Sequence, residues 1–260
     1  MLGVTAIVPT SRRPALLERA LRSIAAQSVV PDDVLVVHDG PASDLRAIEA
    51  SVRASACPRV TVIANLRSCG PSGARNNGAA QARGEWLAFL DDDDEWLPAY
   101  LENAHERIAA GAVDVVCAGL VYRYDDGTER PGKPACPALA AELFLTRNPG
   151  LIGSNLVVRH ALFTAVGGFD ESLQCAEDLD FGIRLSLHGG VRYAPIPTRL
   201  VRHYQHGGPR ICVPAGDAVR SGIRRFYELH AHRMTSAQRQ EFGRHARQLW
   251  GIDERGQLVV

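Results

Sequence analysis

The sequence Glu85-Trp-Leu-Ala-Phe-Leu90 runs directly into Asp91-Asp92-Asp93-Asp94. A short apolar segment that follows a glycine and ends in a polar cluster is typical of a buried strand. Four adjacent carboxylates repel one another, so folding alone does not favour them, and a solvated acidic loop is the simplest alternative. Oxygen ligands of this kind bind hard cations such as Mg²⁺ or Mn²⁺ together with substrate phosphates. We therefore expect a divalent cation and a diphosphate where this strand ends.

Short apolar segments alternate with amphipathic ones on the N-terminal side of this strand. Such alternation predicts a doubly wound α/β fold, in which one mostly parallel sheet is flanked by helices. Ligands then bind beyond the carboxyl ends of the strands, where Thr10, Asp39 and the four aspartates are expected to lie. The expected strands are 4–9, 34–37, 59–64 and 85–90, and the expected helices are 14–27, 42–54 and 72–82.

The C-terminal half is less regular. Two closing helices are expected, and the capping-box pattern from Thr235 to Gln238 opens the second of them. We expect one domain over 1–214 and a helical extension over 215–260 that packs on it. The remaining expectations are strands at 113–124 and 153–159, a Pro-rich connector at 130–137, and helices at 138–145, 177–188 (with Leu187 facing inward), 217–232 and 236–250.

The composition excludes several classes of protein. Of the 260 residues, 46% are hydrophobic and 22% charged, which argues against a disordered or fibrous chain. The 29 Lys and Arg balance the 29 Asp and Glu, so no global charge favours nucleic acid. The six cysteines form no CxxC pair, and the N-terminus lacks the pattern of a signal peptide. The expected location is the cytoplasm.

Three further places carry candidate functional groups. Arg75 follows the Gly70-Pro-Ser-Gly73 turn at a helix start, where it could bind a phosphate or simply face solvent. Glu177 and Asp178 open a later helix; a carboxylate there is often only a partner of the helix dipole, but Asp178 could act as a general base. His203 and His206 form a weak HxxH metal signal.

Taken together, these segments resemble family 2 glycosyltransferases with the GT-A fold. The resemblance covers about residues 4–206 and excludes the helices after 214. It implies inverting transfer of a sugar from a nucleotide-diphosphate donor to an acceptor. The matching segments, in order, are Val4–Thr10, Val34–Gly40, Gly73–Gly78, Gly84–Trp96, Gly167–Glu171 and Glu177–Phe181.

The resemblance also implies roles for individual residues. Asp93 would bind the divalent cation, with His206 completing the metal or diphosphate site, and Asp178 would be the catalytic base with Glu177 as its neighbour. Ser11 stands where the family often has an aromatic residue, and His38 where it often has an acidic one; uridine is favoured over guanosine or thymidine as the donor base. The other donor-binding positions are Pro9, Thr10, Ser11 and Arg12 along the base pocket, Asp39 at the base edge, Arg75 at the diphosphate, Asp91 at the ribose or the water shell of the metal, and Asp92; Trp96 and Asn155 are the candidates on the acceptor side.

Two other functions remain open from the sequence. A nucleotidyltransferase would need a basic phosphate-binding loop, of which Ser11-Arg12-Arg13 is a thin version, and a non-catalytic nucleotide-sugar-binding protein would need no base. The acceptor is unknown: a glycan, a lipid-linked molecule and a natural product fit equally well. The arginine-rich C-terminal helices could contact a membrane surface or form a homodimer, although a solvated face is the simpler interpretation.

Overall fold

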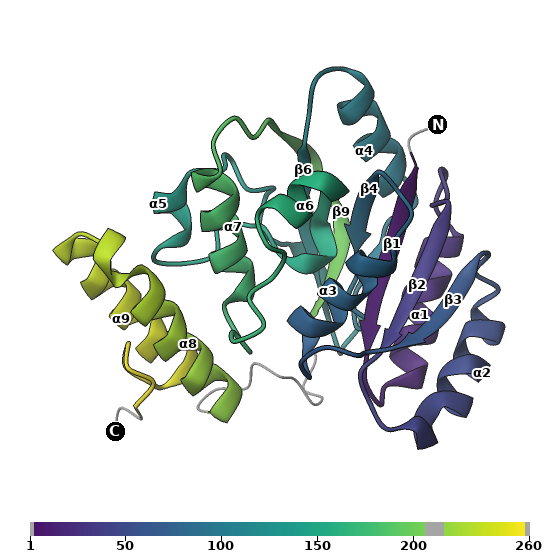
Figure 1. Ribbon diagram of the computed structural model, residues 1–260, viewed down its shortest axis with the longest axis horizontal. Coiled ribbons are helices and arrows are strands. Elements are labelled where there is room, and N and C mark those ends of the chain that lie inside the picture. The colour runs from purple at the N-terminus through teal and green to yellow at the C-terminus, as the bar shows by residue number, and fades with distance from the viewer. Residues whose placement is uncertain (1–2, 206–215, 258–260) are drawn as a thin grey trace.

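The computed structural model describes residues 3–205 and 216–257, and shows one sheet with helices on both faces (Figure 1). Three 3-10 turns, η1 (Ala42–Asp44), η2 (Gly153–Asn155) and η3 (Ala231–Arg233), complete the elements. The strands are β1 (Val4–Thr10), β2 (Asp33–His38), β3 (Val60–Ala64), β4 (Trp86–Phe89), β5 (Glu95–Trp96), β6 (Val115–Tyr124), β7 (Glu129–Pro131), β8 (Leu156–Arg159) and β9 (Tyr193–Gln205). The helices are α1 (Pro14–Ala25), α2 (Leu45–Ser55), α3 (Pro71–Gln81), α4 (Tyr100–Ala109), α5 (Ala141–Phe144), α6 (His160–Ala165), α7 (Glu177–Leu187), α8 (Asp217–His230) and α9 (Ser236–Trp250).

The N-terminal half of the sheet is parallel, as predicted. Its strands lie in the order β3-β2-β1-β4, and each adjacent pair runs in the same direction. Because these strands are parallel, the carboxyl ends of β1, β2 and β4 lie along one edge of the sheet, and the strand order switches between β1 and β4. Thr10, Asp39 and Asp91 follow these three ends, which is why they lie close together.

The C-terminal half of the sheet is mixed. Strand β8 runs antiparallel to both β4 and β6, whereas β6 and β9 are parallel. The short strand β5 pairs antiparallel with β9, which brings residues 93–96 beside residues 201–204. This pairing is what adds His203 and Tyr204 to the edge that carries the aspartates.

Successive side chains of the central strands enter two different cores. Ala6 and Val8 pack with α1, α2 and α4 on one face, and Ile7 packs on the opposite face with α3. Helix α3 lies very close to β1, because a Cβ on Gly78 would come within 2.6 Å of the Ile7 side chain. Because α3 packs so closely on the sheet, Arg75 of this helix is buried and does not face solvent.

The C-terminal helices lie beside α7, on the side of the molecule away from β1–β3 (Figure 1). The predicted capping box is confirmed: the Thr235 hydroxyl accepts from the Gln238 amide, and the Gln238 side chain accepts from Thr235. The prediction that Leu187 faces inward is wrong. Leu187 lies at the end of α7 and is 50% exposed. None of the helices in the described parts of the chain is both long and apolar enough to cross a membrane.

Candidate functional site

A hollow of about 270 Å³ opens at the edge where β1, β2 and β4 end. Its walls come from six separate stretches of the chain, so no single motif forms it. The polar groups lining it are Thr10, Ser11, Arg13, Asp39, Arg75, Asp91, Asp93, Glu177, His203 and Tyr204.

Asp39 organises the wall of the hollow that follows β2. One of its carboxylate oxygens accepts from Asn65 Nδ2 at 2.8 Å, and the other accepts from the amide of Gly70 at 2.6 Å. Its own amide donates to the carbonyl of Thr10 at 2.8 Å. Asp39 therefore fixes the loop 65–70 against the end of β1.

The same loop is tied to residues 169–171 by Glu171. This carboxylate accepts from Ser68 Oγ at 2.7 Å and from Asn76 Nδ2 at 2.9 Å, and it pairs with Arg67 at 2.5 Å. Burial alone would raise the pKa of Glu171, but hydrogen bonds from Asn76, Ser68 and Arg67 outweigh it and lower the pKa to about 2. The ionised carboxylate is thus stabilised in the folded chain.

We expect Glu171→Gln to lower the free energy of unfolding at pH 7 by about 1–3 kcal/mol. A carboxyl whose pKa is depressed by folding stabilises the protein above its unfolded value of 4.5, and that stabilisation is lost as the pH falls toward 2. Urea denaturation at pH 7 and at pH 2 measures the free energy of unfolding of wild type and variant at each pH. The difference between wild type and variant should shrink at pH 2, and Glu106→Gln on the exposed side of α4 should have little effect. A difference that is the same at both pH values would contradict this account.

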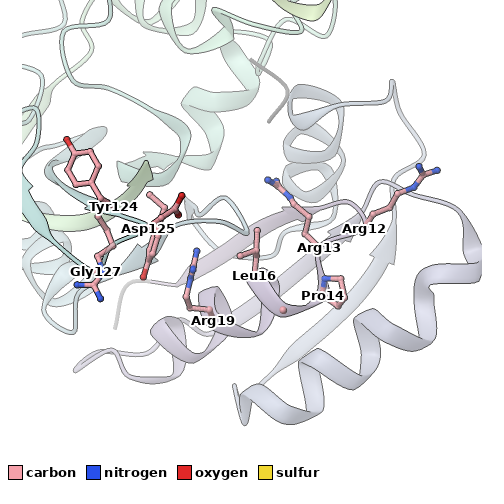
Figure 2. Close-up of a pocket in the computed structure, with 11 residues that line it drawn as sticks. Arg12, Arg13, Pro14, Leu16, Arg19, Tyr124, Asp125 and Gly127 are labelled. Carbon is pink, nitrogen blue, oxygen red and sulfur yellow. The ribbon is translucent and has the colours of Figure 1, made fainter. Parts of the chain in front are cut away.

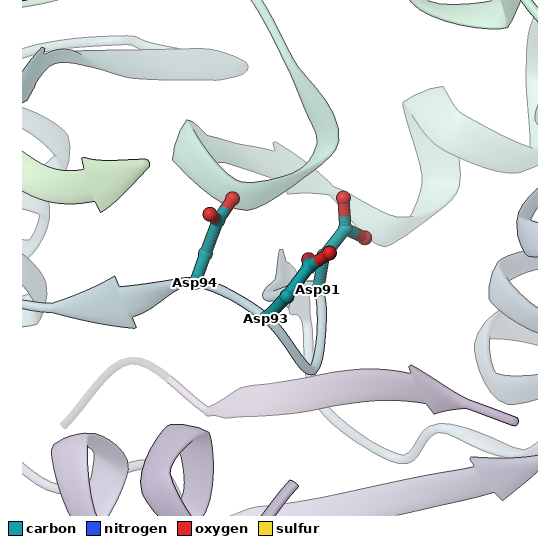
Figure 3. Close-up of side chains that lie close together, drawn as sticks. All are labelled: Asp91, Asp93 and Asp94. Carbon is teal, nitrogen blue, oxygen red and sulfur yellow. The ribbon is translucent and has the colours of Figure 1, made fainter. Parts of the chain in front are cut away.

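Three of the four aspartates form a compact acidic cluster. Asp91, Asp93 and Asp94 each offer an oxygen within 4.8 Å of the others, and their carboxylates point toward the same side of the loop after β4 (Figure 3). Asp94 is held by His203 Nδ1 at 3.1 Å and by the amide of Tyr204 at 3.1 Å. Burial disfavours the charged form of His203, but Asp94, Asp93 and Asp91 raise its pKa to about 9.

The acidic cluster suits a hard divalent cation. Its ligand atoms are carboxylate oxygens, and mutual repulsion adds to burial in raising the pKa of Asp91, although Arg75 opposes the shift. Asp93 also pairs with Arg13 Nη1 at 2.8 Å, so the cluster is partly neutralised by the protein itself. Asp91 and Asp93 both line the hollow, and these two residues fit a cation that also touches a ligand there.

Asp92 was predicted to contact the donor, but it does not line the hollow. Its side chain is fully buried, because it accepts from Thr10 Oγ1 at 2.6 Å and forms an ion pair with Arg13. Burial raises the pKa of Asp92 to about 7, against the opposing effects of Arg13 and Thr10. Asp92 therefore supports Thr10 and Arg13 from beneath the hollow rather than facing it.

Arg75 bridges the two acidic sides of the site. One guanidinium nitrogen, Nη2, lies 2.6 Å from Asp91 Oδ1, and the other, Nη1, lies 3.2 Å from Glu177 Oε1. The group is 2% exposed and packs against Gly153, where a Cβ would come within 2.7 Å of Nη2. Burial opposes its charge, but Asp91 and Glu177 together raise the pKa of Arg75. Arg75 is thus a buried bridge between β4 and α7.

Asp178 follows Glu177 at the start of α7, close enough to Arg75 for the two charges to interact, and the residues lining the hollow include Glu177 but not Asp178. Burial is the main reason that its pKa lies well above the usual carboxyl range, and the charges of Glu177 and Asp91 add to the effect while Arg75 opposes it. Its buried Oδ1 atom makes no hydrogen bond to any described residue. A carboxyl in such a setting holds a proton more tightly than a solvated one, as a general base requires.

The other predicted residues lie in different settings. Trp96 is 2% exposed, and its indole nitrogen donates to the carbonyl of Ser154 at 2.8 Å. Asn155 is fully buried, and its amide donates to the carbonyls of Ala118 and Gly150. Because both side chains are buried, neither has a free surface for the predicted contact with the acceptor. Their hydrogen bonds instead stabilise the core next to the site. His206 lies outside the described residues.

Arg12 points away from the hollow. Its side chain is 73% exposed and approaches Asp44 at 3.8 Å. Pro9, Thr10 and Ser11 line the hollow.

Sequence reasoning assigned no role to Tyr204, named Arg13 only in the basic loop of the alternative function, and treated His203 as a weak signal. Arg13 adjoins a predicted residue, but its partners Asp92 and Asp93 lie about eighty positions away along the chain. His203 and Tyr204 reach Asp94 only because β5 pairs with β9. No local pattern encodes these long-range contacts.

A second, larger hollow of about 790 Å³ adjoins the first and shares Arg13 and Tyr204 with it. One wall is the start of α1 and the other is the turn around Asp125 (Figure 2). Its arginines are already paired within the protein: Arg19 lies over the ring of Tyr204 and 3.3 Å from Glu95, and Arg123 lies 3.4 Å from Glu129. The hollow is open beside the site, with its positive charges balanced.

Comparison with known proteins places this geometry among sugar-transferring enzymes. A model of the family described as glycosyl transferase family 2 matches residues 5–166. WcaA of Escherichia coli, named as a colanic acid biosynthesis glycosyl transferase, is 29% identical over 241 residues, which cover 90% of this chain and 83% of WcaA.

Two further relatives are longer than this chain. The succinoglycan biosynthesis protein ExoO of Rhizobium meliloti is 37% identical over 60% of this chain and 43% of its own length. The GalNAc(5)-diNAcBac-PP-undecaprenol beta-1,3-glucosyltransferase of Campylobacter jejuni is 34% identical over 44% of this chain and 37% of its own length. The chain therefore spans less than half the length of these two relatives.

Solved structures of Staphylococcus aureus TarS have the same fold. Residues 1–349 of TarS, in complex with UDP-GlcNAc, superpose with a TM-score of 0.66 at 22% identity, over 94% of this chain and 71% of the TarS chain. A second complex of the same TarS fragment, with UDP, gives a TM-score of 0.63 over 94% of this chain and 70% of the TarS chain.

Proposed function

The chain belongs to glycosyl transferase family 2, and from that premise we propose an inverting, metal-dependent transfer of a sugar from a UDP-sugar to an acceptor hydroxyl or amine, with Asp178 as general base. The observation that carries the proposal is the Arg75 bridge. It holds Asp91 of the acidic cluster and Glu177 beside Asp178 in a single assembly at the ligand-binding edge of the sheet.

Asp91 and Asp93 are the residues that would hold a Mn²⁺ or Mg²⁺ ion. Such an ion, when bound, neutralises negative charge on the leaving nucleoside diphosphate. Arg13 pairs with Asp93 and shares the wall of the hollow, so it is placed to exchange that carboxylate for a phosphate oxygen when the donor binds.

Asp178 would accept the proton of the acceptor as it attacks the anomeric carbon of the donor. Attack from the face opposite the diphosphate inverts that carbon. The raised pKa of Asp178 suits this task, because a general base works best when its pKa approaches the working pH. Glu177 Oε1 lies 3.2 Å from Arg75 Nη1, and this contact keeps the start of α7 in place.

Uridine is the donor base we propose, because the TarS complexes contain UDP-GlcNAc and UDP. Asp39 and residues 9–11 are the groups placed to meet the nucleoside. The acceptor is proposed only as a hydroxyl or amine of a glycan, a lipid-linked saccharide or a natural product, and the site of the reaction as the cytoplasm.

A thermal-shift experiment with UDP, GDP and dTDP, each with and without Mn²⁺, tests the donor site. We expect UDP with Mn²⁺ to raise the Tm most, since a ligand that binds only the folded chain stabilises it. Asp93→Ala should remove most of the Mn²⁺-dependent part of that shift by deleting a cation ligand. Asp253→Asn, in the C-terminal extension, serves as the matched control. A full Mn²⁺-dependent shift in the Asp93 variant would contradict the assignment.

The nucleotidyltransferase alternative needs a free basic loop near the N-terminus. Of its two arginines, Arg13 lines the hollow, but Arg12 faces away toward Asp44. Product analysis separates the two reactions, because glycosyl transfer releases a nucleoside diphosphate whereas nucleotidyl transfer releases pyrophosphate. The same assay decides against a non-catalytic binding protein if any turnover is measured.

A further inference from the structure

The α8–α9 extension contacts the turn that leads into Asp178. Gly222 of α8 lies so close to Cys175 that a Cβ there would come within 2.6 Å of the Cys175 carbonyl oxygen. The next residue, Ala176, has a φ of 67°, a left-handed conformation that costs an alanine free energy. Such a conformation persists only where the surrounding structure imposes it. Gly222 of α8 packs directly against Cys175, the residue before Ala176.

A buried polar pair joins the extension to α7 itself. His230 Nε2, at the end of α8, lies 2.9 Å from Asp180 Oδ1, and the two residues are 6% and 2% exposed. Arg184 Nε donates to the other Asp180 oxygen at 2.7 Å. Burial disfavours the charge of Asp180, but His230 and Arg184 lower its pKa, so Asp180 is an acceptor at neutral pH and His230 Nε2 must be the donor.

The pair lies within one continuous apolar core. The rings of Phe226 and His230 are tilted against each other with their centroids 4.8 Å apart, and Phe226 belongs to the same buried cluster as Leu179 and Phe181 of α7. His230 Nδ1 makes no hydrogen bond to any described residue, so the Asp180 contact is the polar constraint on the ring. Loss of His230 leaves Asp180 Oδ1 buried without its hydrogen-bond donor, and Arg184 on Oδ2 as the remaining charged partner, which is costly.

We propose that His230 is a positioning residue for the transfer reaction: the C-terminal extension sets the pose of Asp178 through the hydrogen bond from His230 to Asp180. The inference rests on the proposed role of Asp178 as base. Asp180 lies on the same first turns of α7 as Asp178, so a shift of α7 moves the base relative to the Arg75 bridge. A displacement of about 1 Å in a reacting group lowers a rate by about 100-fold.

The test compares His230→Asn with His230→Gln. A glutamine amide nitrogen reaches about as far as Nε2 and can donate to Asp180, whereas the shorter asparagine cannot reach it. The readout is UDP released from UDP-GlcNAc with Mn²⁺ and no acceptor, where water takes the place of the acceptor. We expect His230→Asn to lower kcat by about 10–100-fold, with less than a two-fold change in the Kd for UDP, and His230→Gln to recover most of the rate.

A destabilised variant separates positioning from simple loss of stability. Ile108→Ala removes core volume under α4 on the opposite face of the sheet, and it should lower the Tm while leaving kcat near wild type. Hydrogen exchange of the amides 177–182 should accelerate in His230→Asn but not in His230→Gln. Equal rates for the two His230 variants, or an equal loss of kcat in Ile108→Ala, would overturn the proposal.

The outcomes distinguish this inference from the proposed function. If the wild-type chain releases no UDP from UDP-GlcNAc, the proposed donor chemistry fails, while the exchange comparison still decides whether His230 holds α7. If Asp178→Asn abolishes release but His230→Asn does not, the base assignment stands and the positioning role falls.

Discussion

Asp178→Asn is expected to lower kcat by about 10²–10⁴-fold while leaving the affinity for UDP and Mn²⁺ within about two-fold of wild type. The asparagine keeps the shape of the side chain but cannot take a proton from the acceptor. Steady-state release of UDP gives kcat, and calorimetric titration with UDP gives the affinity.

The same substitution should not destabilise the fold. A buried carboxyl with a raised pKa destabilises the folded chain increasingly as the pH rises above the unfolded value, because the unfolded state ionises first. Asp178→Asn removes that cost, so its Tm at pH 8 should equal or exceed that of wild type. The kcat of wild type should rise with pH over a range above the usual carboxyl pKa. This rise in kcat should be absent in Asp178→Asn.

Asp33→Asn is the matched control for this experiment. Asp33 begins β2, at the edge of the sheet opposite the hollow, and it should retain full turnover. Near-wild-type turnover in Asp178→Asn would show that another group accepts the proton, and Glu177, the neighbouring carboxylate in the hollow, would be the next residue to test.

The parallel half of the sheet could be predicted because its strands are continuous apolar segments separated by amphipathic helices. In the mixed half, the strands predicted at 113–124 and 153–159 correspond to β6 and β8, but the pairing of β6 with β9 could not be predicted. Strand β9 contains Pro195 and Pro197, which break the pattern of a strand, and its pairing with β6 shifts register around Gly119. Strand β5 has only two residues, so its existence depends on β9 and not on its own sequence.

The candidate site likewise contains residues that could be predicted from the sequence and contacts that could not. Asp39, Arg75, Asp91, Asp93 and Glu177 follow recognisable segments, and the fold brings them to one hollow. The sequence does not show that Arg75 is a buried bridge, because the close packing of α3 on β1 comes from Gly78 meeting Ile7 in three dimensions. The contacts of Arg13 and His203 likewise depend on pairing between distant strands and loops.

Arg75→Met should destabilise the chain by about 3–5 kcal/mol at pH 7, because it leaves the buried Glu177 and the half-buried Asp91 without the buried positive charge between them. Methionine retains much of the volume, so the loss is electrostatic rather than a cavity. Urea denaturation measures it, and Arg107→Met on the exposed side of α4 is the control, expected to change stability by less than about 0.5 kcal/mol.

The pH dependence of that loss identifies its cause. Burial already raises the pKa of Asp91, and Arg75 is the group that opposes the rise. Without the arginine the folded chain binds a proton at Asp91 more readily than the unfolded chain does, so stability is lost as the pH rises above about 4. The gap between wild type and Arg75→Met should therefore narrow toward pH 4. A gap that stays constant from pH 4 to pH 8 would mean that Arg75 acts through packing against Gly153 and Phe169, and that the two acidic sides of the site are held together by something other than its charge.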